Sequence, residues 1–266
     1  MVKSVKSVLR KSWPKDLPKT LTYRLGEKPL HEYLENNARQ RPMDTAYVYY
    51  GNEITWKQLN DYTNRLAQFL KNNGIKKGDR VSLFMQNCPQ YLIGHYAIQK
   101  LGAIVVPLNP MYKEVELDYF INEVGVKVVI AGQELYPRIH AIKDKIPTVE
   151  MIITTNYADF LSDKLTIPIP DELKLAKEKL ENTHDLLDIL ETTESLQESA
   201  KINLKEDIGV MVFTSGTTGR PKAAMLTYGN ALFKAAATAS AFRFNESAKT
   251  VAIPPFCHIG TRSTHI

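Results

Sequence analysis

Residues 208–226 read IGVMVF-TSGTTGRPK-AAML and join two apolar runs through a loop of glycines, hydroxyl residues and one lysine. Ile208–Phe213 has the pattern of a buried strand, and Ala223–Leu226 has the pattern of a second strand. Glycine lets an anion approach the backbone amides closely, threonine hydroxyls add donors, and Lys222 adds a positive charge. The stretch therefore predicts a loop that holds phosphate groups and joins two strands.

The spacing of this loop excludes the Walker A motif, which has four residues between its glycines and a lysine directly after the second. Here two residues separate Gly216 from Gly219, both expected to allow left-handed backbone conformations, and Arg-Pro precedes Lys222. A helix starts only after the second strand, where Thr227 can act as N-cap of a helix reaching about Phe242. The alternative is a flexible surface turn, since glycine, serine and threonine are common in loops. The flanking apolar strands and the Pro-Lys pair favour the phosphate loop.

The preceding part of the chain alternates between strand patterns and helix patterns. The expected strands are Thr45–Tyr50, Arg80–Met85, Ala103–Pro107, Val126–Ala131 and Glu150–Thr154. The expected helices are Leu30–Arg39, one from a Thr55 cap to Gly74, one from an Asn87 cap to Lys100, Lys113–Val124 and Leu135–Lys145. Such alternation implies right-handed crossovers and an α/β fold with a mostly parallel sheet flanked by helices.

Three further structural expectations follow from local patterns. Gly51-Asn52 should form a two-residue hairpin turn after the first strand. The strands on either side of the phosphate loop should be the start of a second sheet. Residues 167–205 are charged and glycine-free from Asp171 to Ala200, which predicts a surface connector or insertion with solvated helices.

Composition excludes several classes of protein. The 266 residues are 44% hydrophobic and 24% charged, as in an ordinary soluble globular protein. The net charge of +5 comes from lysines spread along the chain, with no basic stripe, so no nucleic-acid partner is expected. Cys88 and Cys257 form neither a disulfide framework nor a metal-ligand pattern, and no apolar run approaches the ~20 residues of a transmembrane segment. The basic N-terminus lacks the apolar core of a signal peptide, so a cytoplasmic location is expected.

The run from Phe213 to Tyr228 resembles the signature of the AMP-forming adenylate-forming enzymes, which include acyl-CoA synthetases, luciferases and peptide-synthetase adenylation domains. Ala223 and Tyr228 stand where that family usually has glycine and histidine. The alanine adds only a methyl group, and the tyrosine keeps a hydrogen-bonding aromatic ring. Four other segments resemble family landmarks in the same order: Ile54–Leu59, Lys77–Val81, Lys100–Pro110 and Pro255–His258. The opening residues Trp13–Pro18 and Lys28–Tyr33 look most like the medium- and long-chain fatty acid branch.

The resemblance implies a fatty acid–CoA ligase that uses ATP, Mg²⁺ and coenzyme A. A fatty acid carboxylate would attack the α-phosphate of MgATP, and coenzyme A would then displace AMP from the acyl-adenylate. Lys222 would offset phosphate charge, and His258 would line the carboxylate and pantetheine end of the acyl pocket; the alternative for His258 is a structural, hydrogen-bonded histidine. No residue is implied as a metal ligand. The residues implied to embrace the β- and γ-phosphates are Thr214, Ser215, Gly216, Thr217, Thr218 and Gly219.

The later motifs of that family are not found in the sequence. These are a Tyr-Gly-x-Thr-Glu segment, a ribose-binding aspartate, a hinge and a C-terminal domain with a catalytic lysine. We therefore expect residues 1–266 to be a truncated N-terminal part of the AMP-binding domain, with no complete catalytic set and no activity alone. The alternative is a non-catalytic remnant, or half of a split enzyme that acts as a binding module and needs a complementing C-terminal chain.

Overall fold

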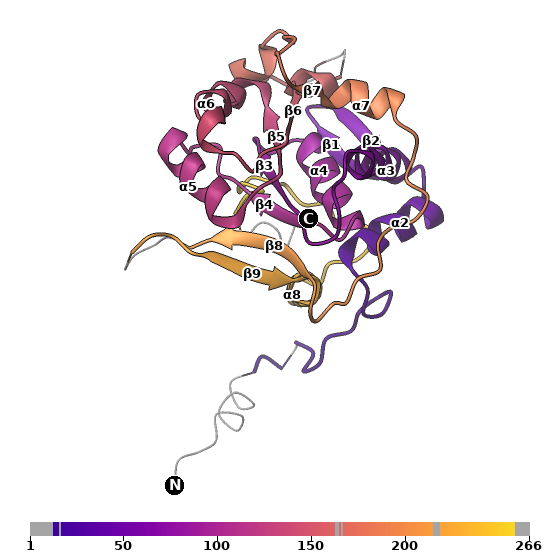
Figure 1. The fold of residues 1–266 in the computed structure, drawn as a ribbon. Helices are drawn as coiled ribbons and strands as arrows, with labels where there is room; N and C mark the ends of the chain where they lie inside the picture. Colours follow the sequence, from indigo (N-terminus) through magenta and orange to yellow (C-terminus); the bar gives the residue numbers. More distant parts are fainter. Residues whose placement is uncertain (1–12, 16, 163–164, 166, 215–218, 259–266) are drawn as a thin grey trace.

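The structure is a computed structural model of the chain, and it describes residues 13–15, 17–162, 165, 167–214 and 219–258. Its main feature is one seven-stranded sheet in the order β7-β6-β5-β3-β4-β8-β9 (Figure 1). The strands are β3 (Arg80–Phe84), β4 (Ile104–Pro107), β5 (Val128–Gly132), β6 (Met151–Thr155), β7 (His184–Asp185), β8 (Ile208–Phe213) and β9 (Ala223–Thr227). Every neighbouring pair is parallel except β8 and β9. The α/β prediction with a mostly parallel sheet is confirmed.

Helices cover both faces of this sheet, and the sheet separates the buried core into two layers, one on each face. The helices that contribute buried side chains to the first layer are α2 (Leu30–Gln40), α3 (Trp56–Asn72), α4 (Pro89–Lys100) and α7 (Leu186–Thr192). Those that contribute to the second are α5 (Glu114–Val124) and α6 (Tyr136–His140). Helix α8 (Tyr228–Ala241) follows β9 and packs against β8, β9 and α2. In β3, Leu83 lies in the first layer and Phe84 in the second, because successive side chains of a strand point to opposite faces.

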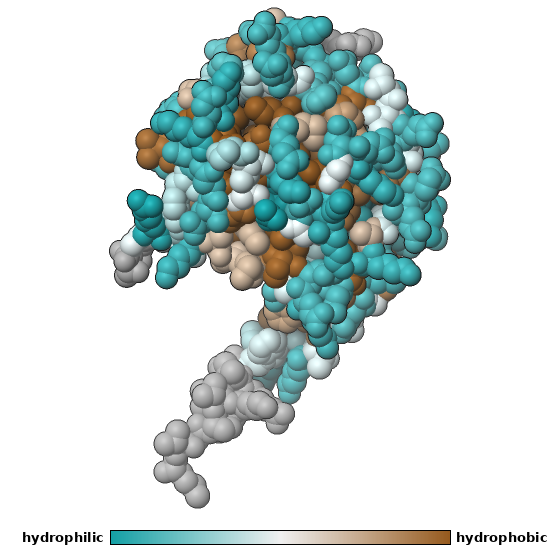
Figure 2. Space-filling view, viewed as in Figure 1, coloured by the Kyte–Doolittle hydropathy of each residue, from teal (hydrophilic) through white to brown (hydrophobic). Residues whose placement is uncertain are grey.

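The expectation that residues 208–226 begin a second sheet is wrong. β8 returns beside β4 in parallel, with Val210 opposite Val105, and β9 pairs with β8 as an antiparallel hairpin in the same sheet. β8 therefore has a neighbour on each side, and β9 is the edge strand. The surface over this hairpin is apolar (Figure 2), and Met225 on β9 is 64% exposed.

The small sheet β1 (Thr45–Tyr49) and β2 (Asn52–Thr55) shows a one-residue error in the predicted turn. Tyr49 pairs with Asn52, so the turn residues are Tyr50 and Gly51 rather than Gly51 and Asn52. Their φ angles are 47° and 91°. Positive φ at both positions gives the primed turn whose twist matches that of the strands, and this decides the register.

Most of the predicted helix boundaries agree with the structure, but the cap expected at Asn87 and the helix expected over Leu135–Lys145 do not. Thr55 forms the predicted cap of α3 in a reciprocal pair with Gln58, and Gly74 follows that helix with φ of 85°. The single helix expected over Leu135–Lys145 is instead divided into η1 (Gln133–Leu135), α6 and η2 (Lys143–Lys145). Ile142 leaves the helical conformation between α6 and η2, and its side chain stays buried in the second core layer.

Residues 167–205 contribute η4 (Asp171–Lys174), β7 and α7, after the short η3 (Tyr157–Phe160). α7 packs on α3, with Leu186, Ile189 and Leu190 buried, whereas residues 174–179, most of them charged, are exposed. β7 pairs with β6 and closes that end of the sheet. Within the described residues, no helix combines the length and apolarity needed to cross a membrane.

A buried charge connects three of the first-layer helices. The Lys100 side chain is 1% exposed, and its Nζ donates to Glu35 Oε1 at 2.7 Å, Asn60 Oδ1 at 2.9 Å and Asn64 Oδ1 at 2.7 Å. Ser199 Oγ also donates to Glu35 Oε1 at 2.7 Å. A buried ammonium is tolerated when all its donors are used, so this cluster fixes how α2, α3 and α4 pack.

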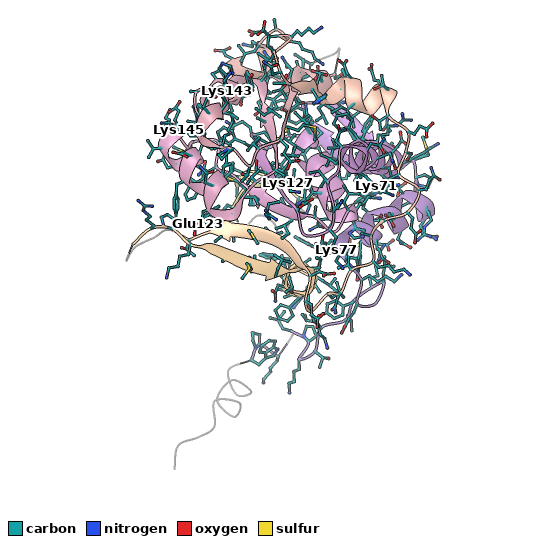
Figure 3. All side chains as sticks on the ribbon, in the orientation of Figure 1. Lys71, Lys77, Glu123, Lys127, Lys143 and Lys145 are labelled. Carbon is teal, nitrogen blue, oxygen red and sulfur yellow. The ribbon has the colours of Figure 1, made fainter. Side chains whose placement is uncertain are left out.

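We predict that Lys100→Met lowers the free energy of unfolding by about 3 kcal/mol, because Glu35, Asn60 and Asn64 lose their common donor inside the protein. Urea unfolding measures this quantity. The matched control is Lys71→Met, which removes the exposed lysine near the end of α3 (Figure 3). Equal effects of the two substitutions would contradict the structural role of the cluster.

His31 makes the stability pH-dependent. It is fully buried on α2, and neither ring nitrogen has a hydrogen-bond partner among the described residues. Burial lowers its pKa to about 4, with Lys100 acting in the same direction and Glu35 opposing it. The histidine of the unfolded chain, with a pKa of ~6.5, therefore binds a proton as the pH falls, at pH values where the buried histidine of the folded chain stays neutral.

We predict that the burial of His31 does not change the free energy of unfolding above about pH 7. Between about pH 6.5 and 4 it should lower the free energy of unfolding progressively. The loss should approach about 3 kcal/mol near pH 4, from 1.36 kcal/mol for each pKa unit. His31→Phe should remove that part of the pH dependence. Urea unfolding of both proteins across this range separates the histidine from the carboxylates, and parallel curves would refute the prediction.

Candidate functional site

The carboxyl ends of the central strands define the place where a ligand can bind. β3 continues into α4 on one face of the sheet, whereas β4 continues into α5 on the other face. Open α/β sheets bind ligands at such a point, where consecutive crossovers diverge, outside the carboxyl ends of the strands. β8 lies next to β4, so the residues that follow Phe213 emerge beside this point.

The predicted phosphate loop begins there and joins β8 to β9, as expected. Thr214 N donates to Lys222 O at 3.0 Å, and Lys222 N donates to Thr214 Oγ1 at 3.1 Å. These two bonds bring the first and last residues of the loop together, and both side chains are exposed. Ser215, Gly216, Thr217 and Thr218 lie outside the described residues. Gly219 has open space where a Cβ would stand, and its φ lies outside the left-handed region, so the structure does not use the left-handed conformation that this glycine allows.

Helix α5 contacts residues at both ends of the loop. Phe120 packs against Phe213 with ring centres 4.2 Å apart, next to the start of the loop. Tyr119 Oη donates to Pro221 O at 2.7 Å, and the Arg220 guanidinium lies 5.5 Å from the centre of the Tyr119 ring. α5 lies above β8 and β9 in Figure 1, with Glu123 labelled at its end in Figure 3. These contacts were not predicted, because α5 and the loop are far apart in sequence.

Asn87 has a different role from the one predicted. It does not cap α4, which begins at Pro89 after Cys88, since proline occupies the first helical position readily. Its side chain instead holds a distant segment: Nδ2 donates to Ala252 O at 3.0 Å and Pro254 O at 2.9 Å, and Oδ1 accepts from Phe256 N at 2.7 Å. The Cys-Pro pair was the sequence signal that left Asn87 outside the helix.

The segment held by Asn87 carries His258. Phe256 is 1% exposed and packs against Tyr91 of α4, whose hydroxyl donates to Phe256 O at 3.2 Å. His258 N donates to Pro255 O at 3.0 Å, and the His258 side chain is exposed. The structure therefore brings Thr214 and Lys222 together, and it places His258 on a separate segment fixed to the end of β3.

Tyr228 is directed into the core rather than toward the loop. It is 1% exposed, and its hydroxyl donates to the carbonyl oxygens of Gln99 at 3.2 Å and Ala103 at 3.1 Å. Burial raises the pKa of this tyrosine, so it stays neutral. Thr227 and Asn230 form the reciprocal cap that starts α8. Tyr228 is the hydrogen-bonding aromatic residue expected at the helix start, and it fixes α8 to the end of α4.

Among the described residues, the loop offers the hydroxyl of Thr214, the guanidinium of Arg220 and the ammonium of Lys222. Such groups suit a multiply charged anion such as the phosphates of a nucleotide. Within the described ranges, no group of three or more His, Cys, Asp or Glu residues is arranged to hold a metal ion.

We predict that Asn87→Asp releases the segment that carries His258, because a carboxylate cannot donate to the two carbonyl oxygens. The free energy of unfolding should fall by about 2 kcal/mol. The amides of Phe256 and His258 should exchange hydrogen faster, as measured by NMR. Asn109→Asp is the matched control, since Asn109 Oδ1 only accepts, from Met111 N at 2.9 Å. Unchanged exchange in Asn87→Asp, or an equal change in the control, would count against this role.

Comparison with known proteins gives consistent matches. Residues 34–266 match the family described as AMP-binding enzyme. A long-chain-fatty-acid–CoA ligase of Bacillus subtilis strain 168 is 36% identical over 256 residues, which is 93% of this chain and 45% of that protein. The crystal structure of a long-chain-fatty-acid-CoA ligase from Archaeoglobus fulgidus has the same fold, with a TM-score of 0.74 at 22% identity, over 95% of this chain and 46% of that one. A fatty acyl CoA synthetase of Mycobacterium tuberculosis gives 0.67 at 25% identity, over 89% and 42%. The chain thus spans about half the length of the relatives that it matches.

Proposed function

Because this chain belongs to the AMP-binding enzyme family, we propose that it is the phosphate-binding part of a fatty acid–CoA ligase. The observation that carries the proposal is the loop at the carboxyl end of β8, joined at its base by the Thr214–Lys222 bonds. The names of the relatives support the substrate class, since the Bacillus subtilis protein is named for long-chain fatty acids. The substrates would be a fatty acid, ATP and coenzyme A.

In the proposed reaction the carboxylate of the fatty acid attacks the α-phosphate of ATP, which gives acyl-adenylate and pyrophosphate. The thiol of coenzyme A then attacks the acyl carbon and releases AMP. Residues 214–219 would hold the β- and γ-phosphates, and Lys222 would offset the charge that moves onto the leaving pyrophosphate. His258 would line the carboxylate and pantetheine end of the site. Mg²⁺ would accompany ATP as MgATP, and within the described residues no group of three or more His, Cys, Asp or Glu is arranged to hold it.

A second candidate is a module that binds nucleotide without turning it over. The observation in its favour is that the chain covers only 45% of its Bacillus subtilis relative. The two candidates differ in turnover and not in phosphate binding. We expect no fatty-acid-dependent AMP formation from this chain alone with ATP, magnesium, coenzyme A and fatty acids of several lengths under either candidate. Turnover on addition of the C-terminal half of the Bacillus subtilis relative would favour the ligase part, and its absence would favour the binding module.

We predict that Lys222→Ala weakens MgATP binding about tenfold or more, since one charge-assisted contact contributes roughly 1.5–3 kcal/mol. The melting temperature should not change, because Lys222 is exposed. Isothermal titration calorimetry and thermal unfolding measure the two quantities. Lys249→Ala, which removes one exposed lysine outside the loop, is the control for net charge. Unchanged affinity with a lowered melting temperature in Lys222→Ala would refute the assignment.

A further inference from the structure

The last residues of the phosphate loop are fixed to helix α5 by a single side chain. Tyr119 Oη donates to Pro221 O at 2.7 Å, which is the carbonyl of the residue directly before Lys222. The face of the same ring carries the guanidinium of Arg220, 5.5 Å from its centre. Tyr119 thus contacts two consecutive residues of the loop by two different interactions, a hydrogen bond and a cation–π contact.

The path from α5 to the ends of the loop is short and continuous. Pro221 has a fixed φ, so holding its carbonyl also limits the direction in which the chain enters Lys222. Lys222 in turn is joined to Thr214 by the two bonds at the base of the loop. On the other limb, Phe120 packs on Phe213, the residue before Thr214. Two adjacent residues of α5 therefore fix both ends of the loop.

Helix α5 is itself rigidly placed. Leu117, Phe120 and Ile121 are buried in the second core layer, and Gly125 ends the helix with φ of 64°. The side chain of Tyr119 is half-buried and lies beside the loop. It lines a shallow pocket together with Val115, Arg220 and Pro221. A rigid support matters at an anion site, because donors that are already in place lose little freedom when the ligand binds.

We propose that Tyr119 is a positioning residue for the phosphate site: it holds Arg220 and Pro221 so that Lys222 reaches the phosphates without prior ordering of the loop. This inference rests on the proposed function, since it concerns the side chain that positions Lys222 for its proposed contact with the phosphates. Tyr119 itself does not contact the nucleotide in this proposal. Its hydroxyl acts only through the carbonyl of Pro221.

The test uses Tyr119→Phe in the full chain, which removes the hydroxyl and keeps a ring for Arg220 to stack on. MgATP affinity, measured by isothermal titration calorimetry, should fall about fivefold, the size expected for one lost hydrogen bond. The melting temperature should change little. Tyr136→Phe is the matched control, because Tyr136 Oη also donates to a backbone carbonyl, that of Glu181 at 3.0 Å, in a different part of the fold. The control should bind MgATP as the wild type does.

A double-substitution cycle tests whether Tyr119 acts through Lys222. In a Lys222→Ala background, Tyr119→Phe should have no further effect on MgATP affinity, since the group that it positions is gone. A fivefold loss that persists in this background would overturn the proposal, because the hydroxyl would then act by another route. An unchanged affinity of the single variant in an otherwise binding-competent protein would also overturn it.

Hydrogen exchange in the absence of nucleotide separates this inference from the proposed function. The amides of Thr214 and Lys222 make the two bonds at the base of the loop, and NMR should find both exchanging faster in Tyr119→Phe but not in Tyr136→Phe. Equal exchange in the wild type and Tyr119→Phe would refute the anchoring. Faster exchange in a chain whose wild type does not bind MgATP would support the anchoring and reject the nucleotide site.

Discussion

The parallel pairing of β8 with β4 is the contact on which the arrangement of the candidate site depends. It adds a segment from late in the chain to the β4 edge of a sheet formed by earlier residues, with Val210 opposite Val105. Contacts on either side hold it there. The Tyr228 hydroxyl binds the carbonyl oxygens at the end of α4, and Lys77 forms an ion pair with Asp207 just before β8. Without this pairing the phosphate loop would have no fixed position relative to the carboxyl ends of the other strands.

The two faces of the sheet make different contributions to the site. α5, on one face, contacts both limbs of the loop through Tyr119 and Phe120. On the other side of the divergence point, Asn87 at the end of β3 holds the segment that leads to His258. α5 follows the carboxyl end of β4, and Asn87 follows the carboxyl end of β3. The crossovers that leave these two strands run to opposite faces of the sheet, which leaves space for a ligand between them. The residues proposed to carry the chemistry, Thr214, Lys222 and His258, are thus exposed, whereas the side chains that hold their segments are buried or half-buried.

Stability and function draw on separate groups of polar residues. The buried Lys100 cluster fixes the helices of the first layer, and Lys100 O accepts from Ala200 N at 2.7 Å, which also fixes the segment that leads to β8. His31 lies beside this cluster and is destabilising only when the unfolded chain takes up a proton. Neither group belongs to the loop.

The sequence by itself determined the elements whose causes are local. The apolar patterns of β8 and β9, the caps at Thr55 and Thr227 and the glycine after α3 depend on residues only a few positions apart, so they could be found without a fold. The loop between the two strands could be proposed as a phosphate site because its residue types and spacing carry the chemistry. The alternation of strands and helices also sufficed for the α/β class.

Only the tertiary structure decided which strands are neighbours and which side chains support the loop. β8 lies in the main sheet rather than in a second one because β4 offers a free edge, and no local pattern encodes that pairing. Asn87 and Tyr119 gain their roles from carbonyl oxygens more than a hundred residues away in the chain. A hydrogen bond to a distant backbone atom leaves no periodicity in the sequence, because it depends on where two separately folded segments meet.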